Sequence, residues 1–322
     1  TIAHLFTPLS YTDGAWTNHA VTVSFDCADQ GGSGVASCSA PVTVSEEGEA
    51  QQVVGTVTDH AGGSATDTAV VSIDRTDPTI TASEDRPADH GAWYDADVTV
   101  TFACADALSG VASCPAPKVL HEGADQAAGG SAHDNAGNSA SDEVTGINVD
   151  ETAPVLTGSF PGGWHTGDVT VTWTCTDELS GIPDQPADST VTGEGGNLGA
   201  TTTCTDRAGN STTESVSSIR IDRTAPTTSA TVSGDLHQGW YQAGVDVALS
   251  ASDNLSGVDA TYYSLDGGDA RPYLAPVSVA DNGTHTLRYW SVDAAGNVEP
   301  RAGNTITLRI DQTPPTLTGA AT

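Results

Sequence analysis

Four segments of the chain alternate apolar and polar residues with a period of two. They read VTVSFDC at 21–27, VTVTFAC at 98–104, VTVTWTC at 169–175 and VDVALSA at 245–251. Such alternation is typical of a β-strand with one buried face and one solvent-facing face. No stretch keeps an apolar period of 3.6 residues over three turns, because Gly, Pro, Asn or Thr interrupts each candidate. The pattern therefore predicts an all-β chain.

Each alternating segment has the same neighbours. A Trp near a Gly precedes it, at Trp16, Trp93, Trp164 and Trp240. An acidic turn follows it, with the sequences DQGGSGV, DALSGV, DELSGI and DNLSGV. A second turn comes later, as DHAGG, DNAGN, DRAGN and DAAGN, and its Gly allows the positive φ of a tight hairpin. The repeated order predicts one small β-domain for each copy.

A third phrase separates the copies. It reads IDRTDP at 73–78, VDETAP at 149–154, IDRTAP at 221–226 and IDQTPP at 310–315. The intervals of about 70 to 90 residues suit one small β-sandwich each. We expect four domains at 1–76, 77–152, 153–224 and 225–313, followed at 314–322 by a tail or the start of a further linker.

These features together resemble the bacterial immunoglobulin-like repeats of secreted and cell-surface proteins, of the actinobacterial type. The last repeat, with DNLSGVDATYYSLDGG and HTLRYWSVDAAGNVEP, is similar to the repeat often appended to extracellular enzymes. The resemblance covers essentially the whole chain and implies four tandem immunoglobulin-like β-sandwich domains arranged end to end. The first repeat departs from the pattern, because DQGGSG lacks the Leu and DHAGG lacks the Asn of the other copies.

The charge and hydropathy of the chain restrict its partners. With 42 acidic and 10 basic side chains among 322 residues, the formal net charge is −32. We therefore expect no binding to nucleic acid and no adhesion to anionic lipid. No apolar run is long enough for membrane insertion. The acidic surface favours cations as partners, but a salty environment or a solubilising coat explains it equally well. With no methionine and no signal-peptide segment, the chain is expected to be a mature or excised fragment.

The six cysteines fall in pairs inside individual repeats. Two pairs flank the first acidic turn of their repeats, and in the third repeat the partner precedes the second turn, as in the inter-sheet bridge of immunoglobulin domains. Such pairs indicate an oxidising, extracellular compartment, secreted or at the cell surface. The expected disulfides are Cys27–Cys38, Cys104–Cys114 and Cys175–Cys204.

The acidic turns suggest a cation site at each junction between repeats. In the immunoglobulin topology both turns lie at the end of the domain where the preceding linker arrives. Three carboxylates at one place repel unless a cation neutralises them, and hard oxygen ligands suit Ca²⁺. Asn138, Asn210 and Asn297 are expected to add amide oxygens. The alternative is that the aspartates only close turns by accepting hydrogen bonds from their own backbone. The candidate ligands are Asp74, Asp106 and Asp134; Asp150, Asp177 and Asp206; and Asp222, Asp253 and Asp293.

The sequence has no motif of an active site. It lacks a GxSxG elbow, an HExxH helix, a P-loop and a dinucleotide fingerprint, and its nine histidines form no ligand pair. We expect no enzymatic activity. The aromatic side chains are densest in the fourth repeat, where a Trp near the first strand is either exposed for a ligand or part of the core. The candidates for ligand contact are Trp240, Tyr241, Tyr263 and Trp290.

Together these observations favour an extracellular, non-catalytic stalk or spacer, or an adhesin-type array, with Ca²⁺ stiffening of the junctions as a further hypothesis. Two alternatives stay open. One is a glycan- or protein-binding accessory module that uses the aromatic residues of the fourth repeat. The other is a subunit of a self-assembling surface filament. The expected partners are accordingly a cell-surface, polysaccharide or protein ligand, or further copies of the chain.

Overall fold

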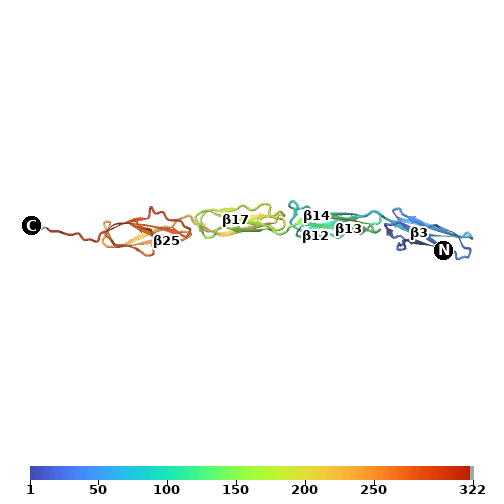
Figure 1. The fold of residues 1–322 in the computed structure, drawn as a ribbon, viewed down its shortest axis with the longest axis horizontal. Coiled ribbons are helices and arrows are strands. Elements are labelled where there is room, and N and C mark those ends of the chain that lie inside the picture. Colours follow the sequence, from blue (N-terminus) through green and yellow to red (C-terminus); the bar gives the residue numbers. More distant parts are fainter. Residues whose placement is uncertain (320–322) are drawn as a thin grey trace. The chain divides into compact units, whose positions relative to one another are not determined.

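The computed structural model describes residues 1–319, and the regular elements of this range are the strands β1 to β29, as the sequence predicts for an all-β chain (Figure 1). The chain forms two compact units. Within the described residues, the first contains 1–153, 178–181 and 206–210, and the second contains 154–177, 182–205 and 211–319.

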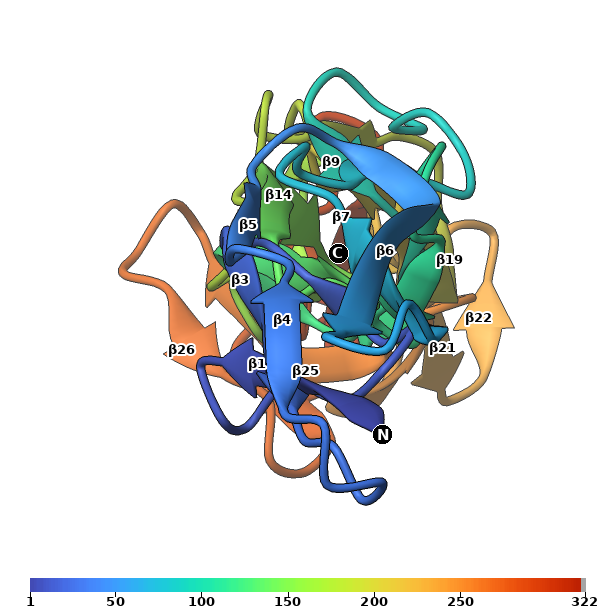
Figure 2. The same cartoon turned by 90° about the vertical axis from the view of Figure 1, so that its right-hand side faces the viewer.

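The first repeat consists of two sheets. One has the order β1 (Ile2–Thr7), β3 (Val21–Cys27), β5 (Val42–Val44). The other has the order β2 (Trp16–Thr17), β7 (Ser64–Ile73), β6 (Gly48–Asp59), β4 (Val35–Cys38). The short strand β2 runs parallel to β7, whereas the other pairs are antiparallel. Figure 2 shows β3 and β5 on one side of this repeat and β6 and β7 on the other.

The second repeat has the same arrangement. Its first sheet has the order β8 (Thr79–Glu84), β10 (Val98–Ala105), β12 (Lys118–Leu120). Its second sheet has the order β9 (Trp93–Tyr94), β14 (Ser139–Val149), β13 (Gly123–Asp134), β11 (Val111–Ser113). Here too the short strand that begins with the repeated Trp is parallel to its neighbour, β14.

The third repeat pairs β15 (Val155–Ser159), β17 (Val169–Thr176) and β18 (Ser189–Val191) in one sheet. Its other sheet has the order β16 (Trp164–His165), β20 (Ser211–Ile221), β19 (Gly195–Thr205). The parallel pairing of β16 with β20 repeats that of the first two copies.

The fourth repeat has a larger second sheet. Its first sheet has the order β21 (Thr227–Ser233), β24 (Val245–Ser252), β27 (Val277–Val279). The second has the order β22 (Leu236–His237), β23 (Trp240–Tyr241), β29 (Thr305–Ile310), β28 (Gly283–Asp293), β25 (Val258–Leu265), β26 (Arg271–Pro272). The additional strand β22 forms a hairpin with β23.

A separate hydrophobic core lies between the two sheets of each repeat. The alternating segments supply two inward valines to every copy, each at most 3% exposed: Val21 and Val23, Val98 and Val100, Val169 and Val171, Val245 and Val247. Burying one such side chain contributes roughly 1.5 to 3 kcal/mol relative to its exposure. The sheets and cores fall inside the four predicted ranges, whose end points stay a prediction.

Three disulfides join the two sheets of the first three repeats, with the pairing expected from the sequence. They are Cys27–Cys38, Cys104–Cys114 and Cys175–Cys204. The third differs in its surroundings, because Cys175 in β17 and Cys204 in β19 are 1% and 2% exposed and belong to the core that contains Trp173. Cys38 and Cys114 are exposed.

An ion pair in the fourth repeat makes its stability depend on pH. His285 Nδ1 lies 2.7 Å from Asp266 Oδ2. The Asp266 carboxylate and the Asp281 carbonyl raise the pKa of His285 above 6.5. The His285 ring and the Thr286 N–H lower the pKa of Asp266 below 3.8. The His285 imidazolium stabilises the fold below pH 6.5, and this stabilisation is lost as the pH rises through the folded pKa of His285. The Asp266 carboxylate stabilises the fold above pH 3.8, and this stabilisation is lost as the pH falls through the folded pKa of Asp266.

We therefore expect the pair to stabilise the repeat most between about pH 4 and pH 6.5. An NMR titration of the intact chain should give a His285 pKa above 6.5, and Asp266→Asn should return it towards that value. The control is Asp269→Asn, which removes the same charge from an exposed loop of the same repeat and should leave the titration of His285 unchanged. A His285 pKa that does not respond to Asp266→Asn would contradict the assignment.

Candidate functional site

Two clusters of three aspartates each lie within one unit. In each, one carboxylate oxygen from every member lies within 4.8 Å of the others. Asp74, Asp106 and Asp134 form the cluster of the first unit, and Asp222, Asp253 and Asp293 that of the second. Of the three remaining candidates, Asp150 and Asp206 belong to the first unit, and Asp177 belongs to the second, where it follows β17.

The first acidic turn is closed by its own aspartate. Asp106 Oδ1 accepts the Leu108 N–H at 3.2 Å and the Gly110 N–H at 2.6 Å. Gly110 has a φ of +80°, which glycine adopts without the strain that a Cβ causes. In the fourth repeat the Leu255 and Gly257 N–H groups donate in the same way to Asp253 Oδ2. This accounts for the repeated sequence DxLSG.

The second acidic turn wraps around a buried carboxylate. Asp134 is 3% exposed. Its Oδ1 accepts the N–H groups of Ala136, Gly137 and Asn138 at 2.9, 2.6 and 2.8 Å. The Asn138 amide donates from Nδ2 to Oδ2 of the same carboxylate at 2.6 Å. Several N–H donors compensate the cost of burying the charge.

The linker aspartate binds to both turns of the following repeat. Asp74 is fully buried. Its Oδ1 accepts the Thr76 N–H at 3.0 Å, and its Oδ2 accepts the Ser109 N–H of the first turn at 2.9 Å. Its main-chain carbonyl accepts Asn138 Nδ2–H of the second turn at 3.0 Å. We call these three hydrogen bonds the linker lock.

The linker lock recurs inside the second unit. Asp222 is also fully buried, and its carboxylate accepts the N–H groups of Thr224 at 3.1 Å and Ser256 at 2.9 Å. Asn297 Nδ2–H donates to its carbonyl at 2.9 Å.

A third copy of the linker lock lies among residues of the first unit. Asp150 Oδ1 accepts the Thr152 N–H at 3.1 Å, and Oδ2 accepts the Ser180 N–H at 3.0 Å. Asn210 Nδ2–H donates to the Asp150 carbonyl at 2.8 Å. The recurrence explains why Asp, Ser and Asn stand at fixed places in the repeated phrases.

The lock keeps Asp74 and Asp222 ionised. Burial alone raises the pKa of Asp74, but the hydrogen bonds from Ser109 and Thr76 outweigh burial, so that the pKa lies below its ordinary value of 3.8. The pKa of Asp222 is lowered for the same reason, with Ser256 and Thr224 as donors. Both residues are therefore carboxylates at neutral pH.

The asparagines have a structural role that the sequence did not predict. Asn138, Asn210 and Asn297 use Nδ2 to donate to the linker carbonyl and to the aspartate of their own turn, and the expectation that their amide oxygens bind a cation stays a prediction. They tie the linker to the turn through the amide nitrogen, because the groups that face them are acceptors.

Sequence reasoning missed a second set of contacts, in which the preceding repeat holds its own linker. Glu47 Oε1 accepts the Arg75 N–H at 2.8 Å and the Thr76 hydroxyl at 3.1 Å. We call this contact the linker clasp. Glu194 holds Arg223 and Thr224 in the same way, and Glu122 accepts the Thr152 hydroxyl.

In the fourth repeat Asn282 takes the place of the glutamate. Its Oδ1 accepts the Gln312 N–H at 3.0 Å, and its Nδ2 donates to Thr313 Oγ1 at 2.9 Å. The sequence does contain a signal for the clasp. In each copy the Glu or Asn that holds the linker stands directly before the Gly that begins a long strand: Gly48, Gly123, Gly195 and Gly283.

One buried carboxylate oxygen in the second unit has no hydrogen-bond partner among the described residues. It is Oδ1 of Asp253, which is buried, whereas Oδ2 of the same residue accepts two N–H groups. A buried, unpaired carboxylate oxygen is costly. Because Ca²⁺ binds oxygens at about 2.4 Å, two ligands on opposite sides of one ion lie about 4.8 Å apart. The spacing of the clusters therefore fits this ion.

The aromatic candidates of the fourth repeat divide into one exposed and three covered side chains. Trp240 is 42% exposed. Tyr241 and Tyr263 are partly buried and pack against the core. Trp290 is 5% exposed, with the guanidinium of Arg301 4.0 Å from the centre of its ring. A buried ring cannot stack on a ligand, so the prediction for Trp290 is corrected.

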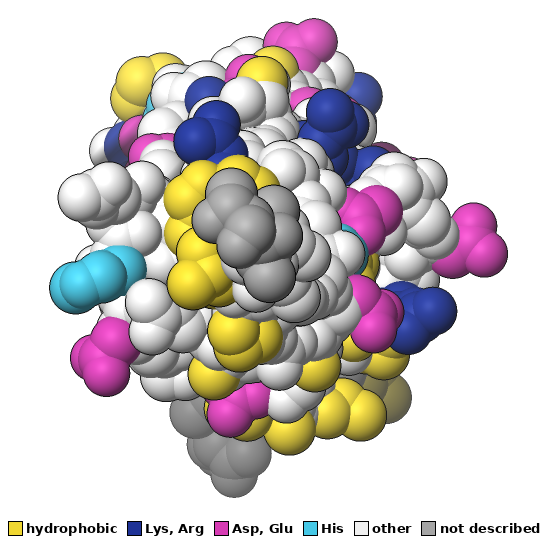
Figure 3. Space-filling model, turned by 90° about the vertical axis from the view of Figure 1, so that its left-hand side faces the viewer, with side chains coloured by type: hydrophobic (Ala, Val, Ile, Leu, Met, Phe, Trp, Pro, Cys, Tyr) yellow, Lys and Arg dark blue, Asp and Glu magenta, His cyan; other side chains and the backbone are white. Residues whose placement is uncertain are grey.

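The surface near the end of the chain mixes side chains of different kinds. Figure 3 shows hydrophobic side chains gathered on this face, with acidic and basic side chains at its border. Residues 1–319 contain no helix with the length and apolarity that a membrane crossing needs.

Comparisons with known proteins gave matches among solved structures alone. No protein-family model and no curated protein matches the chain. The crystal structure of a tetra-tandem repeat in the extending region of a large adhesion protein has 17% sequence identity and a TM-score of 0.32, and the match covers 97% of this chain and 99% of that chain.

Two further structures have lower scores. Extracellular cadherin domains 1–5 of protocadherin gamma B2 have 12% identity and a TM-score of 0.29, with 96% of this chain and 72% of that chain covered. The Escherichia coli adhesin FdeC has 11% identity and a TM-score of 0.18, with 96% of both chains covered. With these TM-scores, the functional proposal rests on the residues of the chain itself.

Proposed function

We propose that the chain is an extracellular, non-catalytic spacer of the adhesin type, in which the junctions between immunoglobulin-like repeats resist bending. The observation that carries the proposal is the two-sided attachment of the linker. Glu47 of the first repeat holds Arg75 and Thr76, and Ser109 and Asn138 of the second repeat hold Asp74. A linker bound by both neighbours has little freedom to act as a hinge.

The energetics of these contacts support a stiff junction. A hydrogen bond to a charged group contributes roughly 1.5 to 3 kcal/mol. Opening the first junction breaks the Ser109 N–H bond to Asp74 and leaves a buried carboxylate with one donor fewer. Pro78 further restricts the linker, because its ring fixes φ. The disulfides of the first three repeats support the extracellular location.

We infer further that Ca²⁺ binds at the aspartate clusters and adds to this stiffness. Asp222, Asp253 and Asp293 supply hard oxygen ligands within reach of one ion. The unpaired Oδ1 of Asp253 supports the inference, since a cation would satisfy it. An ion bound to the linker aspartate and to both turns would cross-link the two repeats that meet there.

Small-angle scattering of the full chain, with particle mass measured by light scattering, tests the spacer. We expect monomers with a single narrow distribution of maximum dimension in EGTA, and a distribution at least as narrow in Ca²⁺. A broad distribution in both buffers would overturn the proposal. A mass of many chains would favour the filament instead.

Calorimetric titration of the same chain with Ca²⁺ tests the metal separately. We expect Asp253→Asn to remove one binding event and to leave the others unchanged. The matched control is Asp269→Asn, which removes the same charge from an exposed loop of the same repeat. Absence of Ca²⁺ binding to the wild type, or equal effects of the two variants, would remove the ion from the proposal and leave the hydrogen-bonded junction.

A further inference from the structure

The third repeat leaves one long strand uncovered at the edge of a sheet. Its second sheet has the order β16, β20, β19, so that β19 (Gly195–Thr205) pairs with β20 alone. In the first, second and fourth repeats the strand at the same place also pairs on its other side, with β4, β11 or β25. An edge strand presents main-chain N–H and C=O groups that are available to a further strand.

Three threonines of β19 direct their main-chain groups to this free edge. The Asp206 N–H donates to the Asn210 carbonyl at 3.0 Å, which sets the alternation of the ladder between β19 and β20. Every second residue before Asp206 therefore exchanges hydrogen bonds with β20, and the residues between them face the other way. The outward-facing residues are Thr201, Thr203 and Thr205.

In the first two repeats other groups satisfy the equivalent edge. Thr56 stands at the place of Thr203, because both lie three residues before the aspartate of the second turn. The Ser39 N–H donates to the Thr56 carbonyl at 3.1 Å, and the Thr56 N–H donates to the Ser39 hydroxyl at 2.9 Å. In the second repeat Lys118 Nζ donates to the Gly129 carbonyl at 2.5 Å. Among the hydrogen bonds of the described residues, the main chain of Thr203 has no such partner.

A disulfide fixes the uncovered strand in place. Cys204 of β19 is bonded to Cys175 of β17 in the opposite sheet, and both are buried. In the first two repeats the bridge instead holds the short covering strand, because Cys38 ends β4 and Cys114 directly follows β11. The bridge of the third repeat therefore keeps the register of the edge strand itself, and a partner that pairs with it has less disorder to overcome.

The sequence of β19 lacks the features that usually prevent pairing at an edge. It contains no charged residue and no proline. Its register shifts all lie before Ala200, and the ladder is regular from there to Thr205. The threonines are β-branched and favour the extended backbone of a strand. A partner strand of ordinary length can pair with a segment of this size.

We propose that β19 binds an extended segment of a partner protein that carries lysine or arginine side chains. Main-chain hydrogen bonds to the outward-facing threonines extend the sheet by one strand. The charge of the segment follows from the surroundings, because residues 177–206 contain six acidic side chains and no Lys, Arg or His. A second copy of the chain is disfavoured, because both copies carry a net charge of −32. This surface is independent of the spacer proposal.

Fluorescence anisotropy of a labelled peptide with the full chain tests this surface. The basic probe alternates threonine with lysine and valine, and the acidic probe has glutamate in place of lysine. We expect the wild type to bind the basic probe at least tenfold more tightly than the acidic probe. N-methylation of two adjacent central residues blocks hydrogen bonding at both edges of the basic probe, keeps its charge, and should abolish its binding.

Thr203→Pro removes the N–H that faces the free edge and leaves the hydrogen bonds between β19 and β20 in place. It should weaken binding of the basic probe at least tenfold. The matched control is Thr203→Val, which keeps the N–H and the β-branched shape and should leave the affinity unchanged. Thermal unfolding shows whether each variant keeps the fold. The N-methylated probe tests the surface on the wild type even if Thr203→Pro unfolds the third repeat.

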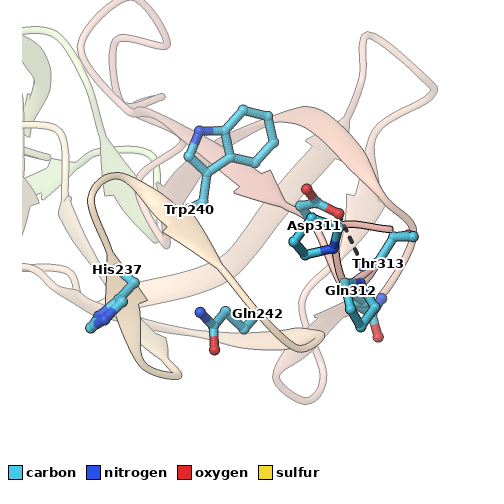
Figure 4. A pocket seen from close by; sticks show the side chains of 8 residues that line it. His237, Trp240, Gln242, Asp311, Gln312 and Thr313 are labelled. Carbon is cyan, nitrogen blue, oxygen red and sulfur yellow. Dashed lines mark hydrogen bonds between the residues drawn. The ribbon is translucent and has the colours of Figure 1, made fainter. Parts of the chain in front are cut away.

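Trp240 is a competing site, because a lysine side chain can stack on its indole, which is 42% exposed and which Figure 4 shows beside Asp311. Trp240→Ala should leave the affinity for the basic probe unchanged. The proposal would be overturned by no binding of the basic probe, by equal binding of the acidic or the N-methylated probe, by equal affinity of the wild type and a folded Thr203→Pro, or by loss of binding in Trp240→Ala.

Discussion

Asp222→Ala is expected to open the junction between the third and fourth repeats and to destabilise it by roughly 2 to 5 kcal/mol. The substitution leaves the N–H groups of Thr224 and Ser256 without their acceptor at a fully buried position. Each unpaired buried donor costs roughly 1 to 3 kcal/mol. The loss of stability is expected at the junction and not inside the repeats, because Asp222 belongs to neither hydrophobic core.

Hydrogen exchange measured by mass spectrometry checks this result. Peptides that contain Ser256 should exchange faster by a factor of 10 or more, since 1.4 kcal/mol corresponds to about tenfold. Asp311→Ala is the matched control, because Asp311 stands at the same place of the next linker but is exposed and holds one N–H group. Equal exchange of the Ser256 peptide in the wild type and Asp222→Ala would show that the lock does not hold the junction closed.

Removal of the Cys175–Cys204 disulfide, by alanine at both positions, is expected to destabilise the third repeat by roughly 3 to 4 kcal/mol. The bridge spans 29 residues, and chain-entropy arguments give roughly 3.5 kcal/mol for a loop of this size. Both sulfur atoms lie in the core beside Trp173, so lost packing adds to the entropic effect.

Scanning calorimetry of the full chain measures this loss of stability as a lower midpoint temperature for the unfolding transition of the third repeat. The matched control removes Cys104–Cys114, which spans 10 residues and has one exposed cysteine. Its expected cost is smaller, roughly 2.5 to 3 kcal/mol. If the two double variants lost the same stability, neither the longer loop of the third bridge nor its location inside the core would have the expected effect.

The sequence predicted the strands and the turns because both depend on local chemistry. Alternation placed Val169 and Val171 on the inner face, and Asp-Gly spacing located the turns closed by Asp106 and Asp134. The proximity of Asp74 to these turns followed from topology, since a linker must enter at one end of its sandwich.

Other contacts could not be predicted because they depend on register and on distant loops. Tyr289 and Trp290 are consecutive, so strand alternation predicts that one of them is exposed. Both are buried, because Tyr289 joins the core and Arg301 from the following loop covers Trp290 on the other face. The role of Glu47 could not be predicted for a similar reason, because the Thr76 hydroxyl that donates to it lies 29 residues later in the chain.

The linker lock also bears on how an array of this kind can change its length. The linker brings Asp and Thr, and the following repeat brings a Ser N–H and an Asn amide, so each junction uses the same parts. Duplication or deletion of a whole repeat cut at the linker would recreate a matching junction without compensating mutations. The first repeat is the exception, because Gly63 occupies the place of the Asn. If the first repeat were moved to an internal position, its junction with the preceding repeat would lack the hydrogen bond that the Asn donates to the linker carbonyl. Unequal recombination should therefore preserve the second to fourth repeats as the interchangeable modules.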